Sequence, residues 1–238
     1  MKIFEGHKKK FSQLKINNDL WNSSLYLNHI KSKILKKNKK KDININYLFS
    51  ILGILSKFNK KQKIIVLDYG GGAGVSYNKN FLIKNKNQII YIYDNLKLIK
   101  LGKKYQKKNN VRFISEIRFL PKKIDILFLG SVLQYIEQPK KLFDKLVKFC
   151  PKFIVLEDVF ALENDEFVTY ENFSGLKIKF KFHNLKKLFH LFNNLNYKLF
   201  FKMPYIPIIK GKYKFYDMSN LPKKYQKFYT YNLVFVNK

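Results

Sequence analysis

A carboxylate followed by a cluster of glycines is the segment of this chain best suited to bind a ligand. Asp68 stands two residues before Gly70, and residues 70–74 hold four of the ten glycines in the chain. Glycine permits positive φ angles and lets the backbone approach a ligand where a side chain would collide. The preceding residues 64–67 are all apolar. We therefore expect a buried strand that runs into a ligand-binding turn.

Two common phosphate-binding patterns do not fit this turn. A P-loop requires Lys and Ser/Thr directly after its last glycine, but Gly74 is followed by Val75 and Ser76. The dinucleotide pattern Gly-x-Gly-x-x-Gly requires glycine or alanine at Val75. What remains is an Asp-x-Gly-x-Gly-x-Gly pattern, beginning at Asp68. The alternative is a turn that serves only close packing of a helix on a strand.

A second carboxylate, Asp94, follows the apolar segment 88–93 and stands twenty residues after Gly74. An acid at the end of the second strand of an α/β sheet can accept hydrogen bonds from both hydroxyls of a ribose. The alternative is an acid that caps the next helix. Together, the glycine turn and Asp94 indicate a ligand that contains a nucleoside.

The Asp-x-Gly-x-Gly-x-Gly pattern resembles the first motif of class I S-adenosylmethionine (SAM)-dependent methyltransferases, and residues 124–139 are similar to the fourth-strand region of that class. The Val-Leu-Gln-Tyr sequence at 132–135, together with Trp21, Tyr26 and the Gly-Gly-Gly form of the turn, resembles a narrower group assigned as methyltransferases. Members of that group occur among bacterial genes for surface polysaccharides such as O-antigen. The likeness covers residues 20–203 and departs from the class at Asn95 and Leu96.

This resemblance implies SAM as the cofactor, with Asp68 near the ammonium group of SAM, directly or through water. The residues implied in cofactor binding are Asp68, Gly70, Gly71, Gly72, Gly74, Asp94, Gly130 and Ser131.

A hydroxyl acceptor benefits from a general base, and four side chains are candidates. They are Tyr135, Glu157, Asp158 and His183. Each has an alternative role: Tyr135 packs over the cofactor, and the two acids cap a helix or bind water. For His183 we favour a loop residue ahead of a helix cap. The other three histidines have no acid or cysteine at ligand spacing, so we expect no metal site.

Apolar segments alternate with amphipathic ones from residue 63 onward, which indicates a parallel sheet covered on both faces. We expect a Rossmann-like α/β fold with seven strands, mostly parallel, and an antiparallel C-terminal pair. Residues 1–62 are expected to be a basic, loosely docked arm followed by flanking helices, and 63–238 the core, with an acceptor-side insertion at about 203–229. The expected strands are 63–68, 88–93, 111–115, 124–129, 153–156, 197–202 and 231–236. The expected helices are those from Leu20, over 45–58 and 75–84, around 98–105, from Pro139 and from Asn184.

The charge and composition of the chain limit the cellular compartment and the binding partners that we expect. The net charge is +32, but arginine, the preferred residue for phosphate and base contacts, occurs only twice and the lysines are spread along the chain. We interpret the charge as a solvated lysine surface. The single cysteine, Cys150, is expected to be a small buried residue in a reducing compartment. With no signal sequence and no apolar run of membrane-spanning length, we expect a cytoplasmic protein without a membrane span.

The resemblance implies O-methylation of a carbohydrate or other small acceptor in surface-polysaccharide biosynthesis. Two alternatives stay open at this stage. The first is an RNA methyltransferase, suggested by the charge, and the second is a non-catalytic binding protein with a degenerate methyltransferase fold.

Overall fold

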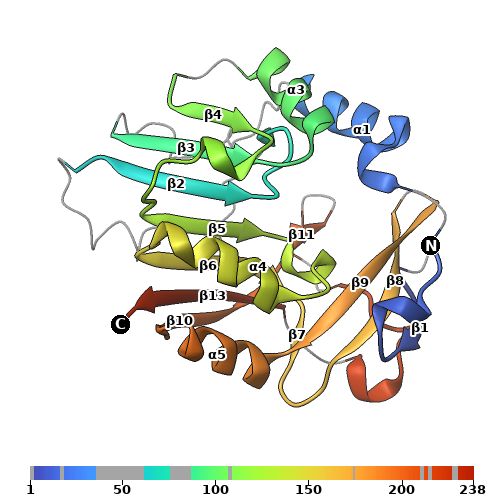
Figure 1. The fold of residues 1–238 in the computed structure, drawn as a ribbon. Helices are drawn as coiled ribbons and strands as arrows, with labels where there is room; N and C mark the ends of the chain where they lie inside the picture. Colours follow the sequence, from blue (N-terminus) through green and yellow to red (C-terminus); the bar gives the residue numbers. More distant parts are fainter. Residues whose placement is uncertain are drawn as a thin grey trace.

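A computed structural model describes residues 3–16, 19–35, 62–75, 87–106, 109–173, 175–209, 212–213, 216–226 and 230–238. Its centre is a seven-stranded sheet with the strand order β10-β13-β6-β5-β2-β3-β4 (Figure 1). The strands are β2 (Ile64–Tyr69), β3 (Gln88–Tyr93), β4 (Val111–Ile114), β5 (Ile126–Gly130), β6 (Phe153–Val159), β10 (Tyr197–Tyr205) and β13 (Thr230–Asn237).

Five of these strands are parallel neighbours, and β13 pairs antiparallel with both β6 and β10. The parallel strands are almost wholly apolar because both of their faces are buried. The expected strands are confirmed, with ends that shift by a few residues. The largest shifts are at the ends of β6 and β10, which each continue three residues further than expected; β6 thus runs through Glu157 and Asp158 instead of ending before them.

Helices cover both faces of the sheet, as expected. On one face, α4 (Pro139–Leu146) and α5 (Leu185–Asn194) contribute Phe143, Leu188 and Phe192 to the core. On the other face, α3 (Leu96–Tyr105) contributes Ile99, which packs with residues of β2, β3 and β4. The Rossmann-like α/β architecture is therefore confirmed. The expected helix at 45–58 and nearly all of the one at 75–84 lie outside the described residues.

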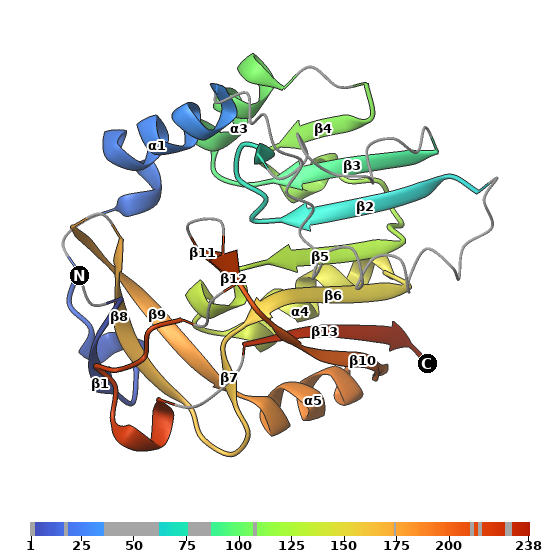
Figure 2. The ribbon, with the colours of Figure 1, turned by 180° about the vertical axis from the view of Figure 1, so that it is seen from behind.

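A second sheet, with the order β1-β8-β9-β7, was not expected from the sequence. It lies on the side toward which the parallel strands point, and α1 (Ser24–Leu35) lies on the same side (Figures 1 and 2). Its inner face is rich in phenylalanine, including Phe167, Phe180 and Phe182. The carboxyl ends of the parallel strands therefore face an apolar, aromatic layer. The strands of this sheet are β1 (Phe4–Lys8), β7 (Ala161–Leu162), β8 (Phe167–Phe173) and β9 (Leu176–Asn184).

The prediction of a loosely docked N-terminal arm is wrong for residues 4–8. They form β1, which pairs antiparallel with β8, and the side chain of Phe4 is 1% exposed. Phe11 and Leu14, which follow β1, are also buried and pack against Val168 of β8, so three apolar side chains hold this N-terminal segment on the second sheet.

Two further local predictions need correction. The first helix begins at Ser24 and not at Leu20, because residues 20–22 form a separate 3-10 turn capped by Asp19. Cys150 is exposed and not buried; it ends a 3-10 turn with φ 51°, the left-handed region. A short hairpin of β11 (Ile208–Ile209) and β12 (Lys212–Tyr213) lies in the segment 203–229.

The cap of α5 is confirmed, since the side chain of Asn184 accepts a hydrogen bond from the backbone N–H of Lys187 at 2.9 Å. Replacing Asn184 with Ala leaves that N–H without its acceptor, so we expect the free energy of unfolding to fall by about 1 kcal/mol. Denaturant titration measures this loss. Asn194→Ala, at the exposed end of the same helix, is the matched control and is expected to change stability by less than about 0.5 kcal/mol.

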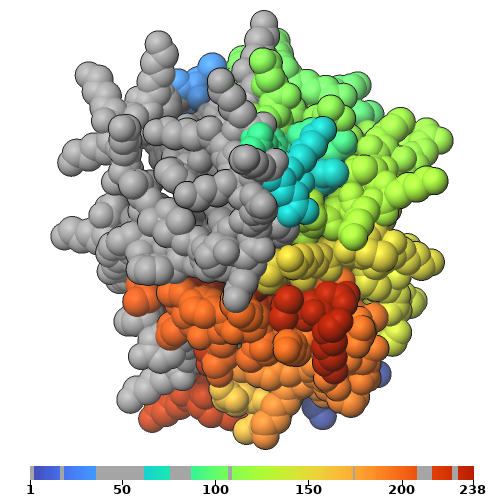
Figure 3. Space-filling model, turned by 90° about the vertical axis from the view of Figure 1, so that its left-hand side faces the viewer, coloured from blue at the N-terminus to red at the C-terminus, as the bar shows by residue number. Residues whose placement is uncertain are grey.

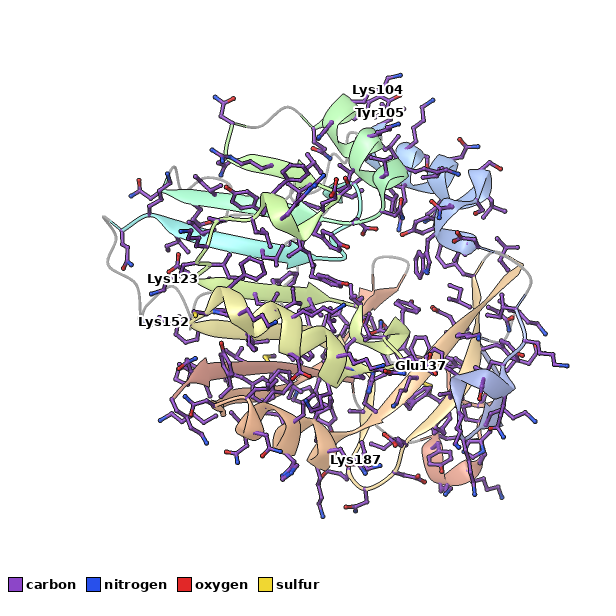
Figure 4. All side chains as sticks on the ribbon, in the orientation of Figure 1. Lys104, Tyr105, Lys123, Glu137, Lys152 and Lys187 are labelled. Carbon is purple, nitrogen blue, oxygen red and sulfur yellow. The ribbon has the colours of Figure 1, made fainter. Side chains whose placement is uncertain are left out.

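Surface lysines are dispersed over the elements. Lys123 and Lys152 lie where β5 and β6 begin, Lys104 lies on α3 and Lys187 on α5 (Figure 4). The view onto the amino ends of the parallel strands shows the red end of β13 beside the orange residues that precede it in the chain (Figure 3).

Within the described ranges, no helix has the length and apolar character needed to cross a membrane.

Candidate functional site

The glycine turn follows β2 and is shaped by Asp68. The side chain of Asp68 is 4% exposed, and a Cβ atom on Gly71 would lie 2.2 Å from its Oδ2 atom. Gly71 is therefore needed to make room for the carboxylate and not for a ligand. Gly70 and Gly74 adopt positive φ, and side chains there would meet Val132 or Phe113. The packing alternative thus explains these three glycines.

Gly72 is different. It has φ +60°, and no described atom lies within 4 Å of the position that its Cβ would occupy. The turn therefore presents bare backbone to open space at this one residue. Such a position admits a ligand against the main chain, as expected for the turn as a whole.

Asp94 is tied directly to this turn. Its Oδ2 accepts a hydrogen bond from the N–H of Gly72 at 2.8 Å, and its Oδ1 accepts one from Asn95 at 2.7 Å. The helix-cap alternative is not supported, because the cap of α3 is Asn95, whose side chain accepts from Leu98 N. Each carboxylate oxygen of Asp94 keeps a second acceptor position, and burial raises the pKa of the group. The spare positions suit a pair of donors such as ribose hydroxyls.

The ends of β5 and β6 add a third part of the site. Gly130 pairs in register with Glu157, and Ser131 N donates to the carbonyl of Glu157 at 3.0 Å. Ser131 has φ 53° and is exposed, while its hydroxyl donates to Asp158 Oδ2 at 2.9 Å. A side chain on Gly130 would lie 3.4 Å from Glu157 Oε2. Gly130 and Ser131 thus bring the chain directly over the two acids.

Burial and the crowding of like charges set the pKa values of the two acids of β6. Burial, with the charges of Asp158 and Asp68, raises the pKa of Glu157 to about 8. Burial also raises the pKa of Asp158 to about 6, although hydrogen bonds from the Ser131 and Tyr216 hydroxyls favour its charged form. Glu157 is therefore largely protonated at neutral pH, and Asp158 is largely ionised.

An aromatic wall faces these acids. Tyr135 donates its hydroxyl proton to Glu171 Oε2 at 2.7 Å, and its ring packs edge-on against Trp21 at 5.0 Å. Trp21 also packs against Tyr26 of α1, whose pKa is raised to about 12 by burial and by the charges of Asp94 and Glu171. Tyr26 therefore lies near both Asp94, the acid expected to bind ribose, and Glu171, the partner of Tyr135.

His183 does not fit the role of general base. It lies in β9 and not in a loop, is 2% exposed, and its Nε2 lies 2.9 Å from the carbonyl oxygen of Leu133. Burial lowers the pKa of His183 to about 4, so the ring is neutral and its hydrogen bond fixes the turn at 133–135.

Four residues of the site were not selected as site residues from the sequence. They are Tyr26, Glu171, Tyr216 and Asn232. Glu171 belongs to the unexpected second sheet. Tyr216 comes from the segment 203–229 and donates to Asp158 Oδ2 at 2.9 Å. Asn232 accepts from the N–H of Asp158 at 3.3 Å. Their places depend on contacts between distant segments, which no local pattern indicates.

Removing the Tyr135 hydroxyl tests the coupling between the two sheets. We expect Tyr135→Phe to lower the free energy of unfolding by about 1 to 2 kcal/mol, because the half-buried Glu171 loses its hydrogen-bond donor. Tyr170→Phe is the control, since that hydroxyl makes an exposed bond to the carbonyl of Lys15. Equal effects of the two variants in denaturant titration would contradict a specific role for the Tyr135–Glu171 bond.

Five of the sixteen acidic residues in this strongly basic chain gather around the ends of β2, β3, β5 and β6. They are Asp68, Asp94, Glu157, Asp158 and Glu171. Among the described residues, no group of three or more His, Cys, Asp or Glu is arranged to hold a metal ion. Buried carboxylates are costly unless they have a partner, and those of Asp94, Asp158 and Glu171 have the hydrogen bonds described above.

Comparison with known proteins identifies the fold. No protein-family model matches the sequence, and no curated protein matches it. Solved structures do match in shape. Magnesium protoporphyrin IX methyltransferase from Synechocystis PCC 6803, with bound SAH, has a TM-score of 0.57 at 13% identity and covers 90% of this chain and 95% of its own.

Two further structures are similar. A Haloferax volcanii protein assigned as a methyltransferase, in complex with the activator Trm112, has a TM-score of 0.57 at 11% identity, covering 94% of this chain and 98% of its own. A SAM-dependent methyltransferase from Methanosarcina mazei has a TM-score of 0.53 at 14% identity, covering 77% and 96%. At these identities the likeness concerns the fold alone: the chain has the Rossmann-like fold of SAM-dependent methyltransferases.

Proposed function

We propose that this chain is a SAM-dependent methyltransferase that O-methylates a carbohydrate or other small acceptor. The observation that carries this proposal is the hydrogen bond between Asp94 and Gly72. It joins the one open glycine of the turn to a carboxylate with spare acceptor positions, at the carboxyl ends of adjacent parallel strands. In open α/β sheets this edge is where ligands bind.

The residues fit the chemical groups of SAM one by one. Asp94 would accept hydrogen bonds from the ribose hydroxyls, and the bare backbone at Gly72 would admit the cofactor beside the turn. Asp68 would act near the ammonium group, directly or through water, while Gly130 and Ser131 would border the same space. When bound, SAM supplies a methyl group already activated on a positively charged sulfur.

The acid cluster supports the same assignment by charge. SAM carries a sulfonium and an ammonium group against one carboxylate, so it is a net cation. Asp68 and Asp158 would attract it at short range in a partly buried site, where charges interact more strongly than in water. The remaining task of this chain is to hold the acceptor in line with the methyl group, which supplies much of the rate.

The acceptor is proposed to lie between the two sheets. Tyr135 and Glu171 form one wall, and Asp158 and Tyr216 form the other. Tyr216 comes from the segment 203–229, which supports that segment as part of the acceptor side. Tyr135, Glu157 and Asp158 remain candidates for assisting the hydroxyl. The carbohydrate acceptor, surface-polysaccharide biosynthesis and a cytoplasmic location are supported by the sequence alone.

Transfer of a labelled methyl group tests this function. The full chain is incubated with methyl-labelled SAM and either a bacterial lipid-linked oligosaccharide fraction or total RNA, and label is counted in each. We expect label in the carbohydrate fraction. Label in RNA alone, with binding to RNA that weakens steeply with salt, would replace the carbohydrate with the nucleic acid that the +32 charge suggests. Label in neither fraction, with the cofactor bound, would favour a non-catalytic binding protein.

A further inference from the structure

The pairing of β6 with β13 is interrupted beside the site. Tyr231 pairs with Val159 and Leu233 pairs with Leu156, so the register shifts across Asn232. On the facing strand Asp158 adopts φ 55°, which is unusual for a residue other than glycine. Bulges of this kind turn a side chain away from the regular pleat and occur often next to active sites. The irregularity brings Asp158 and Asn232 together, since Asp158 N donates to Asn232 Oδ1.

In each of these two side chains, only one of the two polar atoms has a hydrogen-bond partner. Asp158 Oδ2 accepts from the hydroxyls of Ser131 and Tyr216, and Asn232 Oδ1 accepts from the backbone. The second polar atom of each, Asp158 Oδ1 and Asn232 Nδ2, is buried and has no hydrogen-bond partner within the described part of the chain. The Thr230 hydroxyl lies near the Asp158 carboxylate and favours its charged form, but it donates to the carbonyl of Tyr205 at 3.3 Å. The residues are 3% and 0% exposed. A buried polar atom without a partner costs free energy, so a bound group is expected to complete the pair.

The chemistry of the two atoms restricts that group. Asp158 Oδ1 needs a donor, whereas Asn232 Nδ2 needs an acceptor. An ammonium group can only donate, and a phosphate or carboxylate can only accept. A hydroxyl does both with one atom. We infer that Asp158 Oδ1 and Asn232 Nδ2 form a subsite that holds a hydroxyl group of the acceptor, which is therefore a polyol such as a sugar. This inference rests on the proposed function for its position beside the methyl donor.

The neighbours of the subsite support that position. Ser131, which donates to Asp158, directly follows Gly130 at the end of β5, where the cofactor is expected. Tyr216 approaches from the segment 203–229 and packs on Phe160 with a ring separation of 4.9 Å. The subsite thus has a cofactor side and an aromatic acceptor side. Aromatic rings beside hydroxyl-binding groups suit a sugar, whose apolar face packs on a ring.

Binding of small probes tests the subsite without relying on turnover. Methyl glucoside, ethylamine and acetate are compared by saturation-transfer NMR on the full chain, with and without S-adenosylhomocysteine. We expect methyl glucoside to bind and the other two probes not to bind. Asp158→Asn and Asn232→Asp preserve size but remove the charged acceptor and the donor respectively, and each is expected to weaken glucoside binding about tenfold. Asp144→Asn, on the exposed side of α4, is the control and is expected to leave binding unchanged.

Three results would overturn the inference. Methyl glucoside fails to bind the wild-type chain, in which case an ordered water alone completes the pair. Both folded variants bind it as tightly as the wild type does. Ethylamine or acetate binds in its place, and the same variants weaken that binding. The calorimetric affinity for S-adenosylhomocysteine, measured on the same samples, separates the two proposals. Loss of glucoside binding with the cofactor retained contradicts the subsite alone, whereas absence of cofactor binding contradicts the proposed function.

Discussion

Glu157→Gln is expected to be more stable than the wild-type chain at alkaline pH and nearly equal to it in acid. The folded-state pKa of Glu157 is raised from 4.5 to about 8 by burial and by the charges of Asp158 and Asp68. Between these values the unfolded chain releases the proton while the folded chain keeps it, so wild-type stability falls as pH rises through this window. Glutamine resembles the protonated acid and removes that loss.

The expected difference is large. A shift of this size corresponds to about 3 to 5 kcal/mol in favour of the variant once the pH exceeds about 8, and to almost nothing near pH 4. Denaturant titrations of both proteins at the two pH values measure it. Glu137→Gln is the matched control, because Glu137 is exposed on the surface (Figure 4). If Glu157→Gln were less stable than the wild type at high pH, Glu157 would be ionised and stabilised in the folded chain, contrary to this assignment.

The second large effect concerns the cofactor. We expect Asp94→Ala to weaken SAM binding by about 100-fold, because it removes the ribose acceptor and also the carboxylate that holds Gly72 N. Asp94→Asn keeps one acceptor oxygen and is expected to have an intermediate affinity. Isothermal titration calorimetry measures both affinities, and Asp144→Ala is the surface control. A folded Asp94→Ala variant that binds SAM within about threefold of the wild type would show that the ribose lies elsewhere.

The central sheet could be predicted because its signals are local. Each parallel strand contains a short apolar run, interrupted in β4 by Arg112. Asp68 near the end of β2 and Asp94 directly after β3 mark where those runs reach the binding edge. The glycine cluster marks the turn for the same reason. The role of each glycine in the turn could not be predicted in the same way, however, because it depends on the contacts of that glycine in the folded chain. Gly71 makes room for Asp68 and only Gly72 faces open space, which depends on where side chains point after folding.

The second sheet could have been found in part. Ile178, Phe180 and Phe182 alternate with lysines along β9, and this period of two is typical of a strand with one buried face. The neighbouring strand β8 and its other partner β1 carry weaker patterns, and the pairing of β1 with β8 joins segments 160 or more residues apart. Glu171 was therefore missed as a partner of Tyr135. Asn232 was missed because a register shift, and not a sequence pattern, brings it to Asp158.

Calorimetric titration of the wild-type chain with SAM and with S-adenosylhomocysteine tests the central claim most directly. The account predicts that both bind in a one-to-one ratio, because Asp94 and the glycine turn are common to the two complexes. It also predicts that SAM binds more tightly as pH rises from about 6 to about 8.5, since its extra positive charge favours ionised Glu157, whereas S-adenosylhomocysteine responds less. No detectable binding of either ligand to the folded chain would contradict the account.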